Sequence, residues 1–289
     1  MRDISAFVIS SRVLTASALF LCALPHSTSA ELAIINDNAL VRSFENKAEA
    51  FVNSKKETLV ADLVKSLQTV SKKVAKEEQP KLAKTSPENR QESVFIISAV
   101  YDCGHCDRWH MGGVATAWAL SSDGVMVTNH HVMANAKGEV MAVSDSKGNL
   151  WPVSKVLATN KAADLCIFKV KGDGFKPLAL SKPAAIGTDV EVIAHPGKRF
   201  FTHTFGKVTR YFSRKSDNTN WMSISADFAK GSSGGPVINP KGEVVGMVSF
   251  TNTLAVPPVK ENGIYRTQMV IKSCTPVSAI WETLSQKPE

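Results

Sequence analysis

The sequence predicts an all-β protein from about residue 91 onward, and three observations support this. Short runs rich in β-branched and aromatic residues follow one another along this part of the chain. Turn sequences such as Ser122-Asp123-Gly124 and Pro240-Lys241-Gly242 separate the runs. A break near Gly172–Pro183 divides the runs into two groups of six. Many short strands at this spacing are typical of β-barrels or β-sandwiches.

Each group supplies six candidate strands. The first group comprises Ser93–Tyr101, Val114–Leu120, Val125–Thr128, Val140–Ser144, Trp151–Ala158 and Leu165–Val170. The second comprises Asp189–Ala194, Phe200–Phe212, Trp221–Ile224, Pro236–Ile238, Val244–Phe250 and Ile264–Val270. A final helix is expected from Pro276 to about Ser285, with Thr275 as its N-cap and proline at the first helical position.

Residues 31–90 differ in composition from the strand region. They are rich in Lys, Glu, Ala and Leu, contain no glycine, and place apolar residues such as Leu59, Leu63 and Leu67 at steps of three and four. This period predicts a charged helical segment, broken into two helices near Asn53-Ser54. A pro-segment, a regulatory arm and an oligomerisation helix are possible functions, and we favour helices that pack on the following domain or separate it from the membrane.

Residues 1–30 have the pattern of a signal peptide. Arg2 and Arg12 precede an apolar run over 13–24, and Ser27-Thr28-Ser29-Ala30 forms a small-residue cleavage site. The run is short for a membrane span, and no later segment is long and apolar enough, so we expect an exported, periplasmic or secreted protein without stable membrane insertion. Cleavage removes two arginines and one aspartate, which changes the net charge from +8 to +7. The basic residues are scattered, which argues against nucleic acid as a partner.

Four cysteines follow the signal peptide: Cys103, Cys106, Cys166 and Cys274. In an oxidising compartment an even number suggests disulfide bonds, and sequence does not choose among the three pairings. The segment Cys103-Gly104-His105-Cys106 also has the spacing of a redox pair, but the βαβ context of such pairs is missing. With His105 and His110 it could bind zinc, although no second ligand pair follows. A small disulfide or a turn is the favoured interpretation, with no metal or cofactor.

Three motifs carry the chemistry. Gly231-Ser232-Ser233-Gly234-Gly235-Pro236 places a serine in a tight glycine turn, where a hydroxyl can be presented as a nucleophile. Upstream lie Thr128-Asn129-His130-His131-Val132 and Asp164, which opens an apolar run. Acyl transfer by serine needs a base, a carboxylate that orients it, and amide donors for the oxyanion. The sequence supplies these groups in the order His, Asp, Ser, and it lacks the Gly-x-Ser-x-Gly elbow of α/β-hydrolases.

These motifs resemble the triad motifs of trypsin-like serine peptidases, and most of all those of the bacterial branch related to the HtrA peptidases. The resemblance runs from about residue 93 to 284 and implies two six-stranded antiparallel barrels, at about 91–175 and 180–275, followed by the helix at 276–285. It thus implies a peptidase domain over 91–289 with the triad between the barrels. HtrA peptidases usually continue into a PDZ domain, which this sequence does not show.

The resemblance assigns roles residue by residue. It implies that His131 is the general base, that Asp164 orients its imidazole, and that Ser233 is the nucleophile. The amides of Gly231 and Ser233 would form the oxyanion hole. Because Ser232 replaces the aspartate that trypsin keeps before its nucleophile, activation by a freed N-terminus is not expected.

The resemblance also suggests a substrate pocket. Asp227 occupies the sequence position of the acidic pocket floor in trypsin, and Ser249, Phe250, Thr251 and Gly263 resemble its walls. A buried carboxylate there would favour Arg or Lys before the scissile bond. In the other interpretation Asp227 belongs to the loop before the nucleophile and has no pocket role.

The sequence therefore predicts a serine endopeptidase that acts on protein or peptide substrates through an acyl-enzyme. The alternative is an inactive trypsin-fold protein that binds peptides or acts as a chaperone. The oligomeric state, the natural substrates and the regulation are not predicted.

Overall fold

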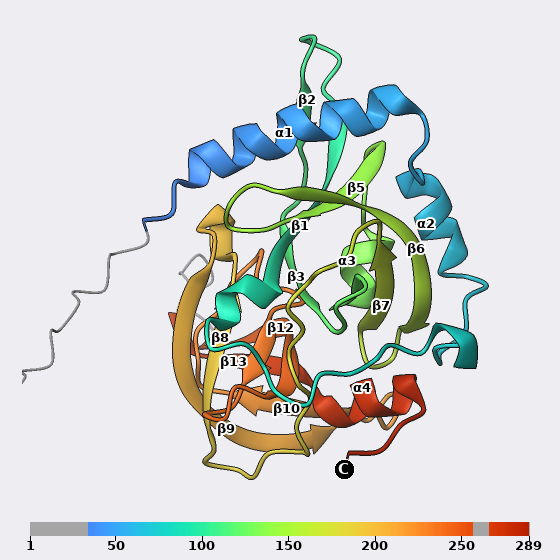
Figure 1. Cartoon of the computed structure of the whole chain (residues 1–289). Helices are drawn as coiled ribbons and strands as arrows, with labels where there is room; N and C mark the ends of the chain where they lie inside the picture. The colour runs from blue at the N-terminus through green and yellow to red at the C-terminus, as the bar shows by residue number, and fades with distance from the viewer. Residues whose placement is uncertain (1–33, 257–265, 289) are drawn as a thin grey trace, which may run out of the picture. The chain divides into compact units, whose positions relative to one another are not determined.

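Two antiparallel sheets, one from each half of the strand series, make up most of the structure (Figure 1). The computed structural model describes residues 34–256 and 266–288, and residues from Ile35 onward form one compact unit. The predicted signal peptide lies outside the described residues, as does Gly263. The predicted all-β class with two six-stranded barrels is confirmed.

The first barrel is built from residues 94–170. Its strands are β1 (Val94–Asp102), β2 (Trp109–Met111), β3 (Ala115–Ala119), β4 (Val125–Thr128), β5 (Val140–Ser144), β6 (Leu150–Asn160) and β7 (Leu165–Val170). The order is β2-β1-β3-β4-β7-β6-β5, and β1 also pairs with β5. This last pairing closes six strands into a ring and leaves β2 as the short arm of a hairpin on β1. The sequence analysis missed β2, because three residues are too few to show a period.

The second barrel is closed, in the order β10-β13-β12-β11-β8-β9. Its strands are β8 (Asp189–Ala194), β9 (Thr202–Ser213), β10 (Asn220–Ile224), β11 (Pro236–Ile238), β12 (Val244–Val256) and β13 (Arg266–Pro276). β13 continues six residues beyond the predicted end at Val270. The prediction of Thr275 as a helix N-cap is wrong, because Thr275 is a buried strand residue whose Oγ1 donates to the carbonyl of Ala163 at 2.7 Å. Pro276 takes the cap position, and α4 spans Val277–Leu284.

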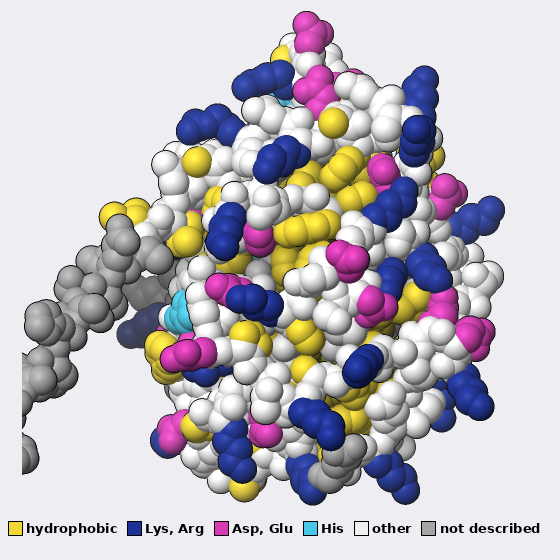
Figure 2. Space-filling view, in the orientation of Figure 1, with side chains coloured by type: hydrophobic (Ala, Val, Ile, Leu, Met, Phe, Trp, Pro, Cys, Tyr) yellow, Lys and Arg dark blue, Asp and Glu magenta, His cyan; other side chains and the backbone are white. Residues whose placement is uncertain are grey.

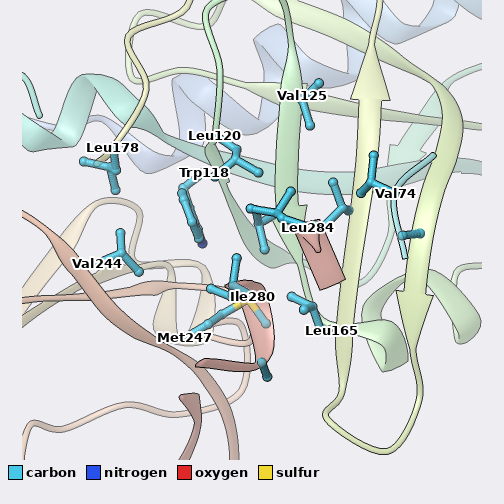
Figure 3. Packing of buried hydrophobic residues seen from close by; sticks show 14 of the residues in the cluster. Val74, Trp118, Leu120, Val125, Leu165, Leu178, Val244, Met247, Ile280 and Leu284 are labelled. Atoms are coloured by element: carbon cyan, nitrogen blue, oxygen red, sulfur yellow. The ribbon is translucent and has the colours of Figure 1, made fainter. Parts of the chain in front are cut away.

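An apolar cluster joins the two barrels through α4. Trp118 of β3, Met247 of β12 and Ile280 of α4 are all fully buried in it. Figure 3 shows these side chains converging, with Leu284 of α4 beside them. Full burial of side chains of this size stabilises a protein by about 1.5–3 kcal/mol each. The cluster therefore fixes the position of one barrel against the other.

The segment before the barrels contains two α-helices, α1 (Asp37–Ser54) and α2 (Val60–Ser66), with short 3₁₀ turns at Lys76–Glu78 and Arg90–Ser93. α1 ends at Ser54, close to the predicted break, and Lys55 adopts a left-handed conformation there. The predicted helical period after Leu67 is not followed by the backbone, which forms turns instead.

Both helices pack on the first barrel. Phe44 of α1 is fully buried against Ile96 and Met111, and Leu63 of α2 is buried with Met133. In Figure 1 α1 lies across β5. The segment thus contributes to the core of the first barrel.

The predicted disulfide bonds are absent from the described residues, where all four cysteines are free thiols. Cys166 is buried in the core of the first barrel and Cys274 in the core of the second, so these two cannot meet. Burial raises the pKa of the Cys166 thiol to about 12, which keeps it protonated and unreactive.

The surface agrees with the predicted scatter of charge. Figure 2 shows Lys and Arg side chains interspersed with Asp and Glu over one face. Among the described helices, none is long and apolar enough to span a bilayer.

Candidate active site

The structure brings His131, Asp164 and Ser233 together, although up to 102 residues separate them in sequence. His131 lies on the short helix α3 (His130–Ala134) after β4, and Asp164 directly precedes β7. Ser233 lies in the turn before β11. The imidazole Nδ1 is 2.8 Å from Asp164 Oδ2, and Nε2 is 3.0 Å from Ser233 Oγ.

These distances determine the hydrogen-bond directions. An ionised carboxylate can only accept, so the proton of neutral His131 resides on Nδ1 and points at Asp164. Nε2 then has a free lone pair, which accepts the Ser233 hydroxyl proton. The alternative acceptor, the Ser249 carbonyl, is 3.5 Å from Ser233 Oγ, which is long for an O–H donor. The hydroxyl is therefore oriented toward a base.

Asp164 is held from several directions. Its Oδ1 accepts from the backbone N–H of His131 at 2.9 Å, and its Oδ2 also accepts from the Ser249 hydroxyl. Its carbonyl accepts from the Asn129 side-chain amide at 2.9 Å. The residue has a φ of +52°, a left-handed conformation that aspartate tolerates better than most residues. The carboxylate therefore binds both the helix and the imidazole of the base.

Glycines shape the turn that carries Ser233. Gly234 has a φ of +86°, and a Cβ there would lie 2.0 Å from the Thr116 carbonyl oxygen. The backbone N–H of Thr116 donates to the Ser233 carbonyl at 2.8 Å, and its hydroxyl donates to the Gly231 carbonyl at 3.0 Å. β3 of the first barrel thus holds the serine turn of the second.

The backbone N–H groups of Gly231 and Ser233 have no hydrogen-bond acceptor among the described residues. Neighbouring groups of the turn are paired: Ser232 N–H donates to the Ala229 carbonyl, and Gly235 N–H donates to the Ser232 carbonyl, both at 2.9 Å. Two free donors beside Ser233 Oγ can bind an oxygen that acquires negative charge.

A cavity of about 520 Å³ opens beside His131 and Ser233. Apolar groups of the first barrel line most of it, and Gly231 and Lys230 contribute the opposite side. Its walls include Ile97, Ala99, Tyr101, Val132, Ala136 and Met141. This apolar hollow can accept a side chain next to the reacting groups.

Three of the residues predicted to form the substrate pocket have other contacts. The side chain of Asp227 is 85 % exposed and pairs with Lys272 at 2.7 Å. Ser249 bonds Asp164, as described above, and the Phe250 ring packs edge-to-face on Trp221 with 4.8 Å between centroids. Thr251 is exposed on β12. The structure does not bring these residues into the cavity beside Ser233.

Two other histidines near the site are buried to different degrees, and burial lowers the pKa of both. His130 Nδ1 is 2.8 Å from Thr159 Oγ1, whose own proton is donated to the Leu165 carbonyl, so Nδ1 of His130 is the donor. Burial lowers the pKa of His130. His195 is fully buried, which lowers its pKa to about 4, and its Nδ1 accepts from the N–H of Phe201 at 3.0 Å.

Residues 115–247 match the family model described as trypsin-like peptidase domain. This part of the chain is therefore similar to trypsin-like peptidase domains. The matched region begins at β3 and ends within β12, so it includes His131, Asp164 and Ser233.

Curated proteins with similar sequences agree with this assignment. The chain is 32% identical over 139 residues to a protein named probable periplasmic serine endoprotease DegP-like from Hahella chejuensis, and 31% identical over 140 residues to one of the same name from Ectopseudomonas mendocina. The two matches cover 46% and 47% of this chain and 29% of each relative. A protein named anti-sigma-I factor RsgI9 from Acetivibrio thermocellus is 28% identical over 175 residues, which cover 59% of this chain and 23% of that protein. The chain thus spans less than a third of these relatives.

The sequence analysis did not name Thr116, and it gave Ser249 a different role, as a wall of the substrate pocket. Thr116 holds the serine turn, and the hydroxyl of Ser249 bonds Asp164. Thr116 lies in an apolar strand 115 residues before Gly231, and no local pattern reveals such a contact. Ser249 follows Ser233 by 16 residues, but only the barrel closure places it beside Asp164.

Proposed function

We propose that this chain is a serine endopeptidase that hydrolyses peptide bonds through an acyl-enzyme, with His131, Asp164 and Ser233 as its triad. The hydrogen-bonded chain from Asp164 Oδ2 through His131 to Ser233 Oγ is the observation that carries the proposal.

In the first step Ser233 Oγ attacks the substrate carbonyl carbon while His131 Nε2 takes the hydroxyl proton. The carbonyl oxygen becomes an oxyanion, to which the N–H groups of Gly231 and Ser233 donate. His131 then gives its proton to the leaving nitrogen, the C–N bond breaks, and the acyl group stays on Ser233. In the second step water attacks the carbonyl carbon of the ester while His131 Nε2 takes its proton. His131 returns the proton to Ser233 Oγ as the ester C–O bond breaks, which frees the carboxylate product and Ser233.

Asp164 remains ionised in this scheme. Its two accepted backbone and hydroxyl hydrogen bonds hold the carboxylate in place while Oδ2 faces the imidazole. The negative charge stabilises the imidazolium that forms in each step.

A fluorophosphonate probe tests the proposal directly. We expect wild type to be labelled on Ser233, and we expect no labelling of Ser233→Ala or of heat-denatured protein. Ser232→Ala is the matched control, because that hydroxyl is buried in the same turn and should leave labelling intact if the protein folds. A folded wild-type protein that stays unlabelled would favour the alternative, an inactive trypsin-fold protein that binds peptides.

The preference for a basic residue before the scissile bond stays a hypothesis that depends on Asp227. Its carboxylate would have to leave Lys272 and face the substrate. Peptides that end in Arg, Lys, Val or Glu before a chromogenic group test this, with Asp227→Asn as the comparison. Equal cleavage of all four by wild type would remove the hypothesis.

We also propose that the protein is exported to the periplasm or secreted. The signal-peptide pattern over 1–30 and the periplasmic relatives support this. Fractionation and the intact mass of the purified protein test it, and a cytoplasmic protein that retains residues 1–30 would contradict it.

A further inference from the structure

The tip of the β1–β2 hairpin gathers three side chains that the peptidase chemistry does not use. The thiols of Cys103 and Cys106 and the ring of His110 place one ligand atom each within 4.8 Å of one another. The two Sγ atoms are 3.5 Å apart, and Cys106 Sγ is 3.1 Å from His110 Nε2. We propose that Cys103, Cys106 and His110 form a Zn²⁺ site.

The local structure explains how these residues meet. β1 and β2 pair with Tyr101 opposite His110, so the six residues 103–108 form the turn between them. The Gly104 N–H donates to Asp102 Oδ1 at 2.7 Å, and Gly104 has a φ of +70°. This tight turn directs both thiols toward the side of the hairpin where His110 lies.

The distances fit zinc better than a disulfide bond. Zinc binds thiolate sulfur at about 2.3 Å and imidazole nitrogen at about 2.0 Å, so two sulfurs of a tetrahedral site lie about 3.8 Å apart and a sulfur and a nitrogen about 3.5 Å. The observed separations of 3.5 and 3.1 Å require small outward movements of the side chains. A disulfide needs the sulfurs at about 2.05 Å. Thiolate and imidazole together favour zinc over magnesium or calcium.

The hairpin offers three ligands and an open position. Cys106 is exposed and Cys103 is half-buried, so water can reach the metal and take the fourth place. The base of the hairpin is held by the first barrel and by α1, since the Met111 N–H donates to Glu45 Oε1 at 2.9 Å. The metal would therefore tie the tip of a hairpin whose base is already fixed.

The position of the hairpin links this site to the cavity beside Ser233. The Tyr101 ring packs on the His110 ring with 5.8 Å between centroids, and Tyr101 lines that cavity. Zinc bound to His110 should hold Tyr101 in place and change the KM for peptides that reach this wall. This second step depends on the proposed peptidase activity, whereas zinc binding does not.

Zinc binding is tested on the full chain purified without a metal-affinity tag, with reduced thiols and with the reductant removed under argon. We expect about one Zn²⁺ per chain in competition with a chromogenic chelator, and a thiolate-to-metal absorption band when Co²⁺ replaces it. Cys106→Ser and His110→Ala should each weaken binding by at least about tenfold. His203→Asn, a histidine of β9 outside the cluster, should bind Zn²⁺ as wild type does.

Reduced, folded wild type that binds no Zn²⁺ would overturn the proposal, and so would binding that survives Cys106→Ser and His110→Ala together. Circular dichroism establishes that each variant folds. Saturation with Zn²⁺ should shift the KM of wild type but not that of His110→Ala. A wild-type KM that does not change on saturation with Zn²⁺ would overturn the link to the cavity. Folded wild type that is not labelled by the fluorophosphonate would refute the peptidase function, and the metal titration would be unaffected.

Discussion

Replacing Asp164 by Asn keeps the shape of the side chain but removes its negative charge and turns one of its two acceptor oxygens into a donor. In the structure Oδ1 accepts from the His131 backbone N–H, and Oδ2 accepts from the His131 ring and from Ser249. An asparagine that keeps its oxygen toward the backbone N–H presents its NH₂ group to His131 Nδ1. The flipped amide is disfavoured, because it would place the asparagine NH₂ group against the backbone N–H of His131, and both groups are donors.

The amide therefore donates to Nδ1 and moves the imidazole proton to Nε2. Nε2 can then no longer accept the Ser233 hydroxyl proton. Loss of the correct tautomer in a serine triad costs about 10⁴-fold in kcat, which corresponds to about 5 kcal/mol of transition-state stabilisation. We expect a loss of this size for Asp164→Asn with little change in KM.

The assay is cleavage of a chromogenic peptide that wild type accepts, with burst titration to count active sites. Ser249→Ala is the matched control, because it removes one hydrogen bond to Oδ2 but leaves the carboxylate. We expect its kcat to fall roughly fivefold, which corresponds to about 1 kcal/mol, the value of a typical hydrogen bond. If folded Asp164→Asn keeps activity within tenfold of wild type, the inferred tautomer is wrong.

Three further predictions concern stability. Gly234→Ala should lower the free energy of unfolding by more than about 3 kcal/mol, because the new Cβ would meet the Thr116 carbonyl oxygen. Gly187 has a similar φ of +90° but open space around it, so Gly187→Ala should lower the free energy of unfolding by only about 1 kcal/mol. Equal losses for the two variants in urea unfolding would refute the clash. His195 has a folded pKa of about 4 against an ordinary value of 6.5, so the unfolded chain binds the proton more readily and stability is lost as pH falls from 6.5 toward 4, by about 3 kcal/mol. His195→Asn should flatten that part of the pH–stability curve, and an unchanged slope would contradict this origin. Phe44→Ala should lower the free energy of unfolding by about 3–5 kcal/mol, because Phe44 is fully buried in the core that α1 shares with the first barrel. A loss below about 1 kcal/mol would instead indicate that α1 is an arm that does not contribute to the folded core.

The strand series and the order of the three motifs were predictable because both depend on local chemistry. Val125–Thr128 has the predicted bounds as β4, since its four residues are all buried and the turn Ser122-Asp123-Gly124 precedes them. Tight turns require glycine, so the Ser233 turn was also recognisable.

The substrate pocket and the cysteines were not predictable in the same way. Asp227 was placed by its distance from Ser233 along the chain, but the side chain points to solvent and pairs with Lys272 of β13, a partner that only the barrel closure supplies. The even number of cysteines suggested disulfide bonds, yet Cys166 is buried in the core of the first barrel and Cys274 in the core of the second.

The sequence by itself determined the strand-rich class, the order of His131, Asp164 and Ser233, and the glycine turn that carries the serine. These follow from residue periodicity and backbone freedom within short segments. Only the tertiary structure decided the hydrogen-bond directions among Asp164, His131 and Ser233, and the free amides beside Ser233. Such features depend on strand register and barrel packing, which bring residues up to about a hundred positions apart to within 3 Å.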